Sequence, residues 1–334
     1  MILPAAFAQQ RGVVEGRILN QTDPSIIAGN VELEVIALGS GMSIIRVEKT
    51  DSMGRFHIEN LPEDQKLLIR ADYQGANYHS NVSFDDKGKA NVDIKVFEST
   101  TSMKDIEVAG AQIAFQAVGD QLRALETVTI DNKTDPPRTF ANSTGNFLIS
   151  KPPGILEPPR IRVIPPEPAM SVVQTAFESP DGQSYYSLYP LRPGTTVFEV
   201  QQLLPYATRS YTFVKKFYLD MGPLDIGVLP RDMVLSGQDL RKIPTDSQQD
   251  FSVYVSPPIK AGTEVTWTFS GGTPAAETAS SQPAGQSSVT AMPNLVDRNS
   301  LIIGPLLLMG LVLVLWYAFN LDRKPKIKGR RSKN

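Results

Sequence analysis

The sequence predicts an all-β fold, with two tandem β-sandwich domains, a disordered linker and one C-terminal transmembrane helix. Apolar residues recur at every second position in segments 31–37, 92–97 and 211–219, which is the spacing of strands with one buried face. Turn-forming pairs such as Pro193-Gly194 interrupt the strands at short intervals, as in β-sandwiches. Residues 301–319 carry no charge. Before them we find no convincing helix of ten residues, although segment 114–125 is ambiguous.

Residues 1–8 (MILPAAFA) are interpreted as the remnant of a signal peptide. They are apolar and end in a small-x-small pattern that signal peptidase cleaves, and polar residues follow from Gln9. The positively charged start of a signal peptide is missing and the apolar run is short. We therefore expect the natural start to lie upstream of Met1. An apolar terminus that arose by chance is the alternative.

Residues 11–98 form the first predicted domain. The segments GVVEGRILN (12–20), the strand at 31–37 and TDSMGRFHIENLP (50–62) together resemble the carboxypeptidase regulatory-like domain. The resemblance implies a transthyretin-like β-sandwich. The residues themselves predict a tight turn from Asp51 to Gly54, core positions at Phe56 and Ile58, and a strand end at Leu61-Pro62.

The resemblance brings no peptidase activity to this chain. In metallocarboxypeptidases such a sandwich accompanies a separate zinc domain, whose ligands begin with a His-x-x-Glu pair. Here the only histidines, His57 and His79, do not begin that motif, and we interpret His57 as a surface residue of a strand. The serines of the second domain have no histidine nearby in the sequence. We therefore predict a non-enzyme with no cofactor, no catalytic residue and no metal site.

Residues 106–269 form the second predicted β-sandwich, of an immunoglobulin-like type, and Leu122 is an alternative start. Aromatic residues cluster within it, and such rings bind partner proteins or stack on sugars. Adjacent strand residues point to opposite faces, so either Tyr185 or Tyr186 is expected on the surface. The alternative is that most of these rings belong to the core. The candidate binding surface consists of Tyr185, Tyr186, Tyr189 and Tyr206.

The C-terminal part reads as a membrane anchor. Residues 271–294 are small and polar, typical of a flexible linker. Residues 301–319 are long enough to span a bilayer, and the tail 323–334 holds seven Lys and Arg without any acid. The positive-inside rule then places the tail in the cytoplasm. A buried core helix is the alternative. The residues expected at the membrane interface are Trp316, Tyr317, Arg323 and Lys324.

The charge limits the classes of partner that the chain can bind, and the cysteine content limits the kinds of crosslink and metal site that it can form. The chain has 33 Lys and Arg and 35 Asp and Glu, so removal of the seven tail cations leaves 26 against 35. An acidic outer part is a poor ligand for nucleic acid, whereas the basic tail suits anionic lipid. Cysteine is absent, which excludes disulfides and thiolate metal sites.

These features predict a non-enzymatic, single-pass protein of the cytoplasmic (inner) membrane. Its N-terminal domains would be extracytoplasmic and would bind an envelope protein or a glycan, and its C-terminus would be cytoplasmic. The first alternative is an accessory subunit of a membrane assembly, of the transporter or cytochrome-maturation type. A hydrolytic enzyme is the second alternative.

Overall fold

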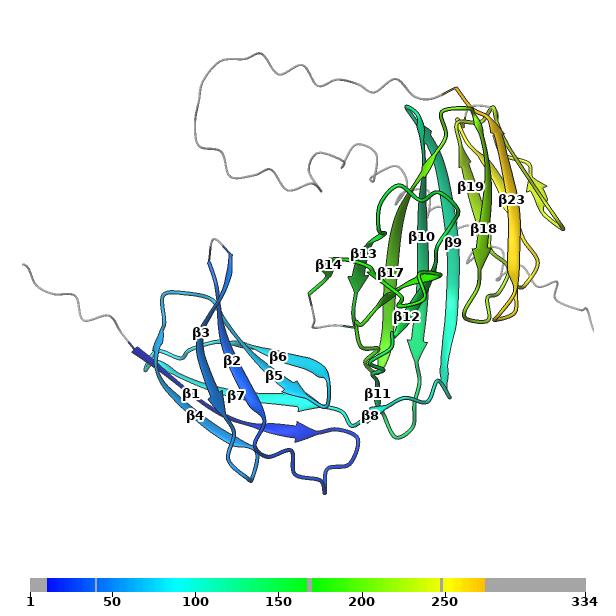
Figure 1. The fold of residues 1–334 in the computed structure, drawn as a ribbon. Helices are drawn as coiled ribbons and strands as arrows, with labels where there is room; N and C mark the ends of the chain where they lie inside the picture. Colours follow the sequence, from blue (N-terminus) through cyan, green and yellow to red (C-terminus); the bar gives the residue numbers. More distant parts are fainter. Residues whose placement is uncertain (1–10, 40, 167–169, 247–248, 274–334) are drawn as a thin grey trace, which may run out of the picture. The chain divides into compact units, whose positions relative to one another are not determined.

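A computed structural model describes residues 11–39, 41–166, 170–246 and 249–273 (Figure 1). All of them belong to one compact unit that ends at Glu277. They form strands and loops and contain no helix, so the all-β prediction is confirmed. Within these ranges there is accordingly no helix of the length and apolarity that a membrane crossing needs. The predictions for residues 1–8, 274–294, 301–319 and 323–334 fall outside the described residues.

Seven strands build the N-terminal part of the described chain. They are β1 (Arg11–Asn20), β2 (Glu32–Leu38), β3 (Met42–Lys49), β4 (Arg55–Pro62), β5 (Leu67–Tyr73), β6 (Ala76–Val82) and β7 (Lys89–Val96). One sheet has the order β4-β1-β7 and the other β3-β2-β5-β6. The β1–β7 pair is parallel and the other pairs are antiparallel. This arrangement is sandwich-like, and its apolar side chains form one core.

The alternating pattern decides which side chains enter this first core. In β7 every second residue is buried, including Val92, Ile94 and Val96. Strand β2 buries Leu33, Val35 and Ala37, as the sequence predicts, but Ile36, expected on the other face, is buried as well, at the register shift against β3. Period-two burial is expected where one face of a sheet is packed and the other faces solvent.

The turn before β4 has the predicted form. The Gly54 amide donates to the Asp51 carbonyl oxygen at 3.0 Å, and Gly54 has a φ of 75°, which suits glycine. The Asp51 carboxylate accepts the amides of Met53 and Arg55, each at 2.8 Å. Phe56 is buried in the core that follows, and β4 ends at Pro62. The turn therefore sets which residues of β4 point inward.

Sixteen further strands follow. They are β8 (Ser99–Thr100), β9 (Ile106–Val118), β10 (Gln121–Asn132), β11 (Thr139–Phe140), β12 (Phe147–Ser150), β13 (Arg160–Ile164), β14 (Val172–Thr175), β15 (Phe177–Glu178), β16 (Ser184–Ser187), β17 (Gly194–Pro205), β18 (Ser210–Lys216), β19 (Asp225–Leu229), β20 (Met233–Gly237), β21 (Arg241–Ile243), β22 (Ser252–Val255) and β23 (Glu264–Gly271). The ambiguous segment 114–125 is thus the end of β9 and the start of β10.

An eight-stranded sheet organises this second part, with the order β14-β13-β17-β10-β9-β19-β22-β21. Two three-stranded sheets, β12-β16-β15 and β18-β23-β20, accompany it, and β8 pairs with β11. One apolar cluster draws residues from all three of the larger sheets. Strand β23 continues to Gly271, so the first residue of the predicted linker belongs to the sheet. The Thr273 amide donates to the carboxylate of Asp232, the residue before β20, at 3.0 Å.

The second core is rich in aromatic rings and contains one ion pair. Phe115 lies 5.1 Å from Phe213 and 6.3 Å from Trp267 between ring centroids, in edge-on arrangements. The Lys215 ammonium donates to Glu126 at 2.8 Å, and both side chains are buried. Lys215 also lies over the ring of Phe217, at 4.9 Å from its centroid. The ion pair is therefore enclosed by protein.

Removal of Lys215 would leave the Glu126 carboxylate buried without its partner. We expect Lys215→Ala to lower the free energy of unfolding by about 3–5 kcal/mol. The neighbouring Lys216 is exposed, so Lys216→Ala should change it by less than about 0.5 kcal/mol. Urea unfolding of the full chain, followed by tryptophan fluorescence, measures both. Equal effects of the two substitutions would contradict the structure.

Gly16 marks a close approach in the first sandwich. A Cβ at this position would lie 1.9 Å from the Val92 carbonyl oxygen and 2.6 Å from the Phe56 ring. We expect Gly16→Ala to destabilise the fold by about 1–3 kcal/mol through overpacking. Gly110 is the matched control, because a Cβ there meets nothing within 4 Å. Thermal unfolding should show Gly110→Ala unchanged or slightly more stable, and a harmless Gly16→Ala would refute the close approach.

Candidate binding surface

The structure separates the four predicted tyrosines. Tyr185 and Tyr206 are buried in the second core. Tyr206 donates its hydroxyl to the Gly271 carbonyl oxygen at 3.0 Å, and burial raises its pKa. Tyr189 is half-buried and accepts a 2.5 Å hydrogen bond from Arg192. Tyr186 is half-buried and, as the next residue on β16, points to the opposite face from Tyr185. The candidate surface therefore keeps Tyr186 of the four.

Tyr186 is the centre of a row of apolar side chains that we call the apolar row, Leu148, Tyr186 and Phe177. Leu148 on β12 lies directly opposite Tyr186 on one side, and Phe177 on β15 lies opposite it on the other. The rings of Phe177 and Tyr186 are 5.6 Å apart between centroids and tilted by 30°. Phe177 is 49% exposed and Leu148 39%. Leu188, two residues beyond Tyr186, is also exposed.

The opposite face of this small sheet is packed. Phe147, Ile149 and Tyr185 are buried there, and Phe147 stacks on Phe198 of the eight-stranded sheet at 4.3 Å between centroids. Alternation along β12 and β16 then forces Leu148 and Tyr186 outward. The apolar row is thus a rigid outer face held in place by the core beneath it.

A close glycine and an ion pair adjoin the apolar row. Gly145 approaches Tyr186 so closely that a Cβ would lie 3.0 Å from the Tyr186 Cβ, and the φ of Gly145 is 127°. Glu178, next to Phe177, forms an ion pair with Lys151, whose ammonium lies 5.6 Å from the centroid of the Tyr185 ring. An apolar centre with a charged neighbour is the usual composition of a protein-binding patch.

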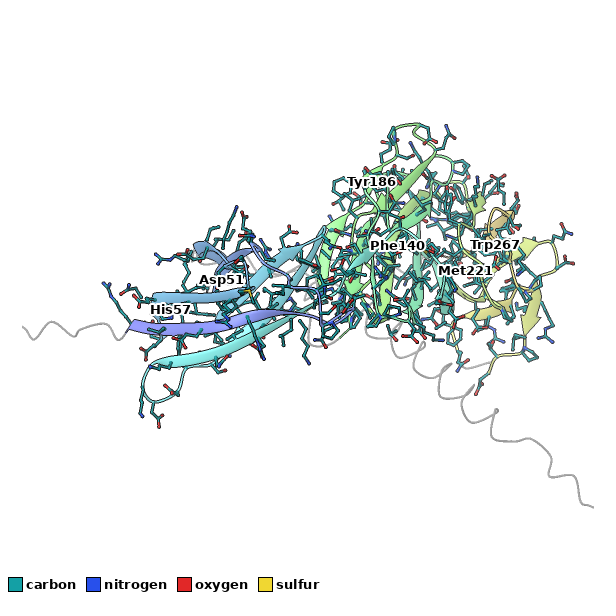
Figure 2. The ribbon with its side chains drawn as sticks, turned by 90° about the horizontal axis from the view of Figure 1, so that it is seen from below. Asp51, His57, Phe140, Tyr186, Met221 and Trp267 are labelled. Atoms are coloured by element: carbon teal, nitrogen blue, oxygen red, sulfur yellow. The ribbon has the colours of Figure 1, made fainter. Side chains whose placement is uncertain are left out.

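A second feature is a shallow polar depression of 780 Å³ on the first sandwich, where the sheet β4-β1-β7 turns its outer face to solvent. His57, which Figure 2 labels on the first sandwich, lies in it. Its Nδ1 is 3.0 Å from a carboxylate oxygen of Glu15, and its Nε2 is 3.0 Å from one of Glu59. Hydrogen bonds to Glu59 and then Glu15 raise the pKa of His57 above its ordinary 6.5. His57 is exposed, as the sequence predicts.

The polar depression consists of solvated charges. Arg17 pairs with Asp93 at 3.5 Å, and both side chains are largely exposed. Among the described residues, no group of three or more His, Cys, Asp and Glu side chains has an arrangement that would hold a metal ion. The apolar row is therefore the better candidate for binding.

Sequence reasoning missed two members of the apolar row. Phe177 belongs to a two-residue strand that the sequence does not mark, and Leu148 lies between two other apolar residues in the four-residue strand FLIS. Leu148 meets Tyr186 through pairing with a segment far along the chain, whereas Phe177 meets it through the neighbouring strand. A signal that was present is the run VVQTAF at 172–177, whose β-branched and aromatic residues favour a strand.

No protein-family model matches the chain, and no curated protein sequence matches it. Among solved structures, one that is similar is an M1 zinc metallopeptidase from Deinococcus radiodurans, with 9% sequence identity and a TM-score of 0.28. The similarity covers 51% of this chain and 43% of the metallopeptidase, so the chain spans less than half of that protein. The likeness is weak, concerns all-β structure in part of the metallopeptidase, and identifies no family.

The paired carboxylates give His57 a measurable pH dependence. The folded state favours the protonated form of His57. The contacts of His57 with Glu15 and Glu59 therefore contribute fully to stability below pH 6.5, and this contribution is lost as the pH rises through the raised pKa of His57. NMR titration of the ring should give a midpoint above 6.5. Glu59→Gln should lower the midpoint most and Glu15→Gln less, whereas Asp93→Asn should leave it in place. A wild-type midpoint at or below 6.5 would contradict the described contacts.

Proposed function

We propose that this protein is a non-enzymatic, single-pass membrane protein that holds its β-sandwiches outside the cytoplasmic membrane and binds a partner protein through the apolar row. The observation that carries the binding proposal is the line Leu148, Tyr186 and Phe177 on an outer sheet face. The anchoring proposal depends on the uncharged residues 301–319 and the basic tail after them. In this topology the tail meets anionic lipid.

The proposal includes the finer fold assignment of the first sandwich. Its seven strands in two sheets, the turn at Asp51–Gly54 and the core residues Phe56 and Ile58 support the resemblance to the carboxypeptidase regulatory-like domain and its transthyretin-like fold. Such a sandwich would act as a spacer or a docking module. The immunoglobulin-like assignment of the second sandwich is part of the same proposal.

A protein partner suits the row better than a glycan does. Sugars stack on one flat ring whose neighbours supply hydrogen bonds, whereas the ring of Tyr186 has Leu148 on one side and Phe177 on the other. Exposed apolar residues in contact with one another are typical of the centre of a protein interface. If the partner is itself a membrane protein, this chain would be the accessory subunit of its assembly.

Photo-crosslinking in intact membranes tests the proposal. A benzophenone side chain in place of Phe177 should form one discrete adduct with a partner protein. Leu156 is the matched control, since it is 50% exposed against 49% for Phe177 and lies outside the row. The same group at Leu156 should give no such adduct.

Affinity measurements with the partner so identified complete the test. Phe177→Ala should weaken binding by about 30-fold, as expected for a residue at the centre of an interface, and Leu156→Ala should leave it unchanged. A row that serves no partner would give adducts of equal yield at both positions. Glycan binding by the full chain that is lost in Tyr186→Ala would replace the protein partner with a sugar.

A further inference from the structure

Strand β3 leaves an apolar edge on the first sandwich. It is the outermost strand of the sheet β3-β2-β5-β6, and its other side has no strand among the described residues. Four of its apolar side chains, Met42, Ile44, Ile45 and Val47, are between 40% and 61% exposed. Edge strands of soluble domains usually carry proline or are short and charged, because an open edge pairs with other strands. Strand β3 has eight residues and no proline.

The backbone direction along β3 follows from one hydrogen bond. The Thr50 amide donates to the Val31 carbonyl oxygen at 3.0 Å, toward β2. In an antiparallel pair, residues alternate between those whose N–H and C=O point to the neighbour and those whose groups point away. Arg46 and Glu48 therefore bond inward to β2. Val47 and Lys49 direct their N–H and C=O groups to the free edge.

The charged side chains on β3 are self-complementary. Arg46 and Glu48 lie two residues apart on one side of the strand, with 3.0 Å between Arg46 Nε and Glu48 Oε1. If an identical strand runs antiparallel with Val47 opposite Val47, then Arg46 faces Glu48 of the second copy and Glu48 faces its Arg46. Two crossed ion pairs would then surround the symmetry axis. Moving the axis to Arg46 would instead oppose two arginines.

The backbone and the charges select the same register. A residue whose N–H and C=O point outward forms a hydrogen-bonded pair with its opposite number, which Val47 does when it lies on the axis. Arg46 and Glu48 then fall in non-hydrogen-bonded pairs, where the side chains lie closer together. A register shift between Val35 and Ile36 makes Ile45 the extra residue on β3, so the straight part of the edge runs from Arg46 to Lys49.

We propose that two copies of this chain associate through β3, antiparallel and about a two-fold axis at Val47. The two four-stranded sheets then form one continuous sheet of eight strands. Isologous pairing of this kind is closed, because each copy uses its only β3 edge. Val47 of each copy then lies opposite Val47 of the other, and Ile45 lies opposite Lys49 of the second copy. This proposal uses a different surface from the apolar row and does not depend on it.

Cysteine crosslinking tests the axis directly. The natural chain has no cysteine, so Val47→Cys introduces a single thiol. Opposed residues in a hydrogen-bonded pair have Cα atoms about 5.5 Å apart, within the range of a disulfide. Mild oxidation of the full chain in detergent should convert most of it to a covalent dimer. Val234→Cys is the matched control, because Val234 is a 50% exposed valine on β20, the edge strand of another sheet, and it should crosslink at least tenfold less.

Charge reversal tests the register in the Val47→Cys background. Arg46→Glu places glutamates opposite each other, and Glu48→Arg places arginines opposite each other, so each should reduce the yield of dimer several-fold. The double exchange Arg46→Glu with Glu48→Arg restores both ion pairs and should restore the yield. Because these side chains are exposed, the thermal unfolding midpoint of the reduced chain, measured at a concentration too low for association, should be unchanged in all three variants.

Three outcomes would overturn the proposal. The first is a Val47→Cys yield no higher than that of Val234→Cys. The second is equal crosslinking of the single charge reversals and the parent, which would mean contact without the stated register. The third is a double exchange that fails to recover the yield while its unfolding midpoint matches the parent. None of these three outcomes would affect the photo-crosslinking result at Phe177, which tests the apolar row separately.

Discussion

The second part of the structure depends on one unbroken backbone ladder. Strand β10 pairs with β17 over its whole length, from Gln121 to Asn132, and with β9 along the same residues apart from one shift. A strand held on both sides cannot slip by one residue without turning its buried side chains to solvent. This constraint places Phe115 and Phe198 on the core side. It also brings Glu126 to Lys215, which comes from another sheet.

Local patterns in the sequence predict strands and their inner faces well. The buried face at 92–96 and the turn at Asp51–Gly54 depend only on residues that are close together in the chain, so a local pattern is enough to predict them. The pattern is silent on pairing partners. Lys215 occupies a core position in an alternating run because Glu126, far away in the chain, neutralises it. Tyr206 is buried for a similar reason, since its hydroxyl is satisfied by the Gly271 carbonyl oxygen.

The candidate surface also depends on strand pairing that the sequence pattern does not give. Composition indicates an aromatic cluster, but whether a ring faces the core depends on its position in a strand and on what lies across the sheet. Tyr185 and Tyr186 are adjacent, and strand geometry points them to opposite faces, so Tyr185 is buried and Tyr186 is half-buried on the outer face. Phe177 joins Tyr186 only because a two-residue strand returns to the sheet edge. The apolar row and the β3 edge are thus two places where exposed apolar residues lie beside one another.

The parallel pairing of β1 with β7 has a mechanical consequence. Val13 to Asn20 pair with Lys89 to Val96 in the same direction, so the chain enters the first sandwich at one end of this ladder and leaves at the other. A pull on the two ends loads all the hydrogen bonds between β1 and β7 at once, in shear, instead of opening them singly like a zipper. The first sandwich is therefore built to resist a force that pulls its own two chain ends apart.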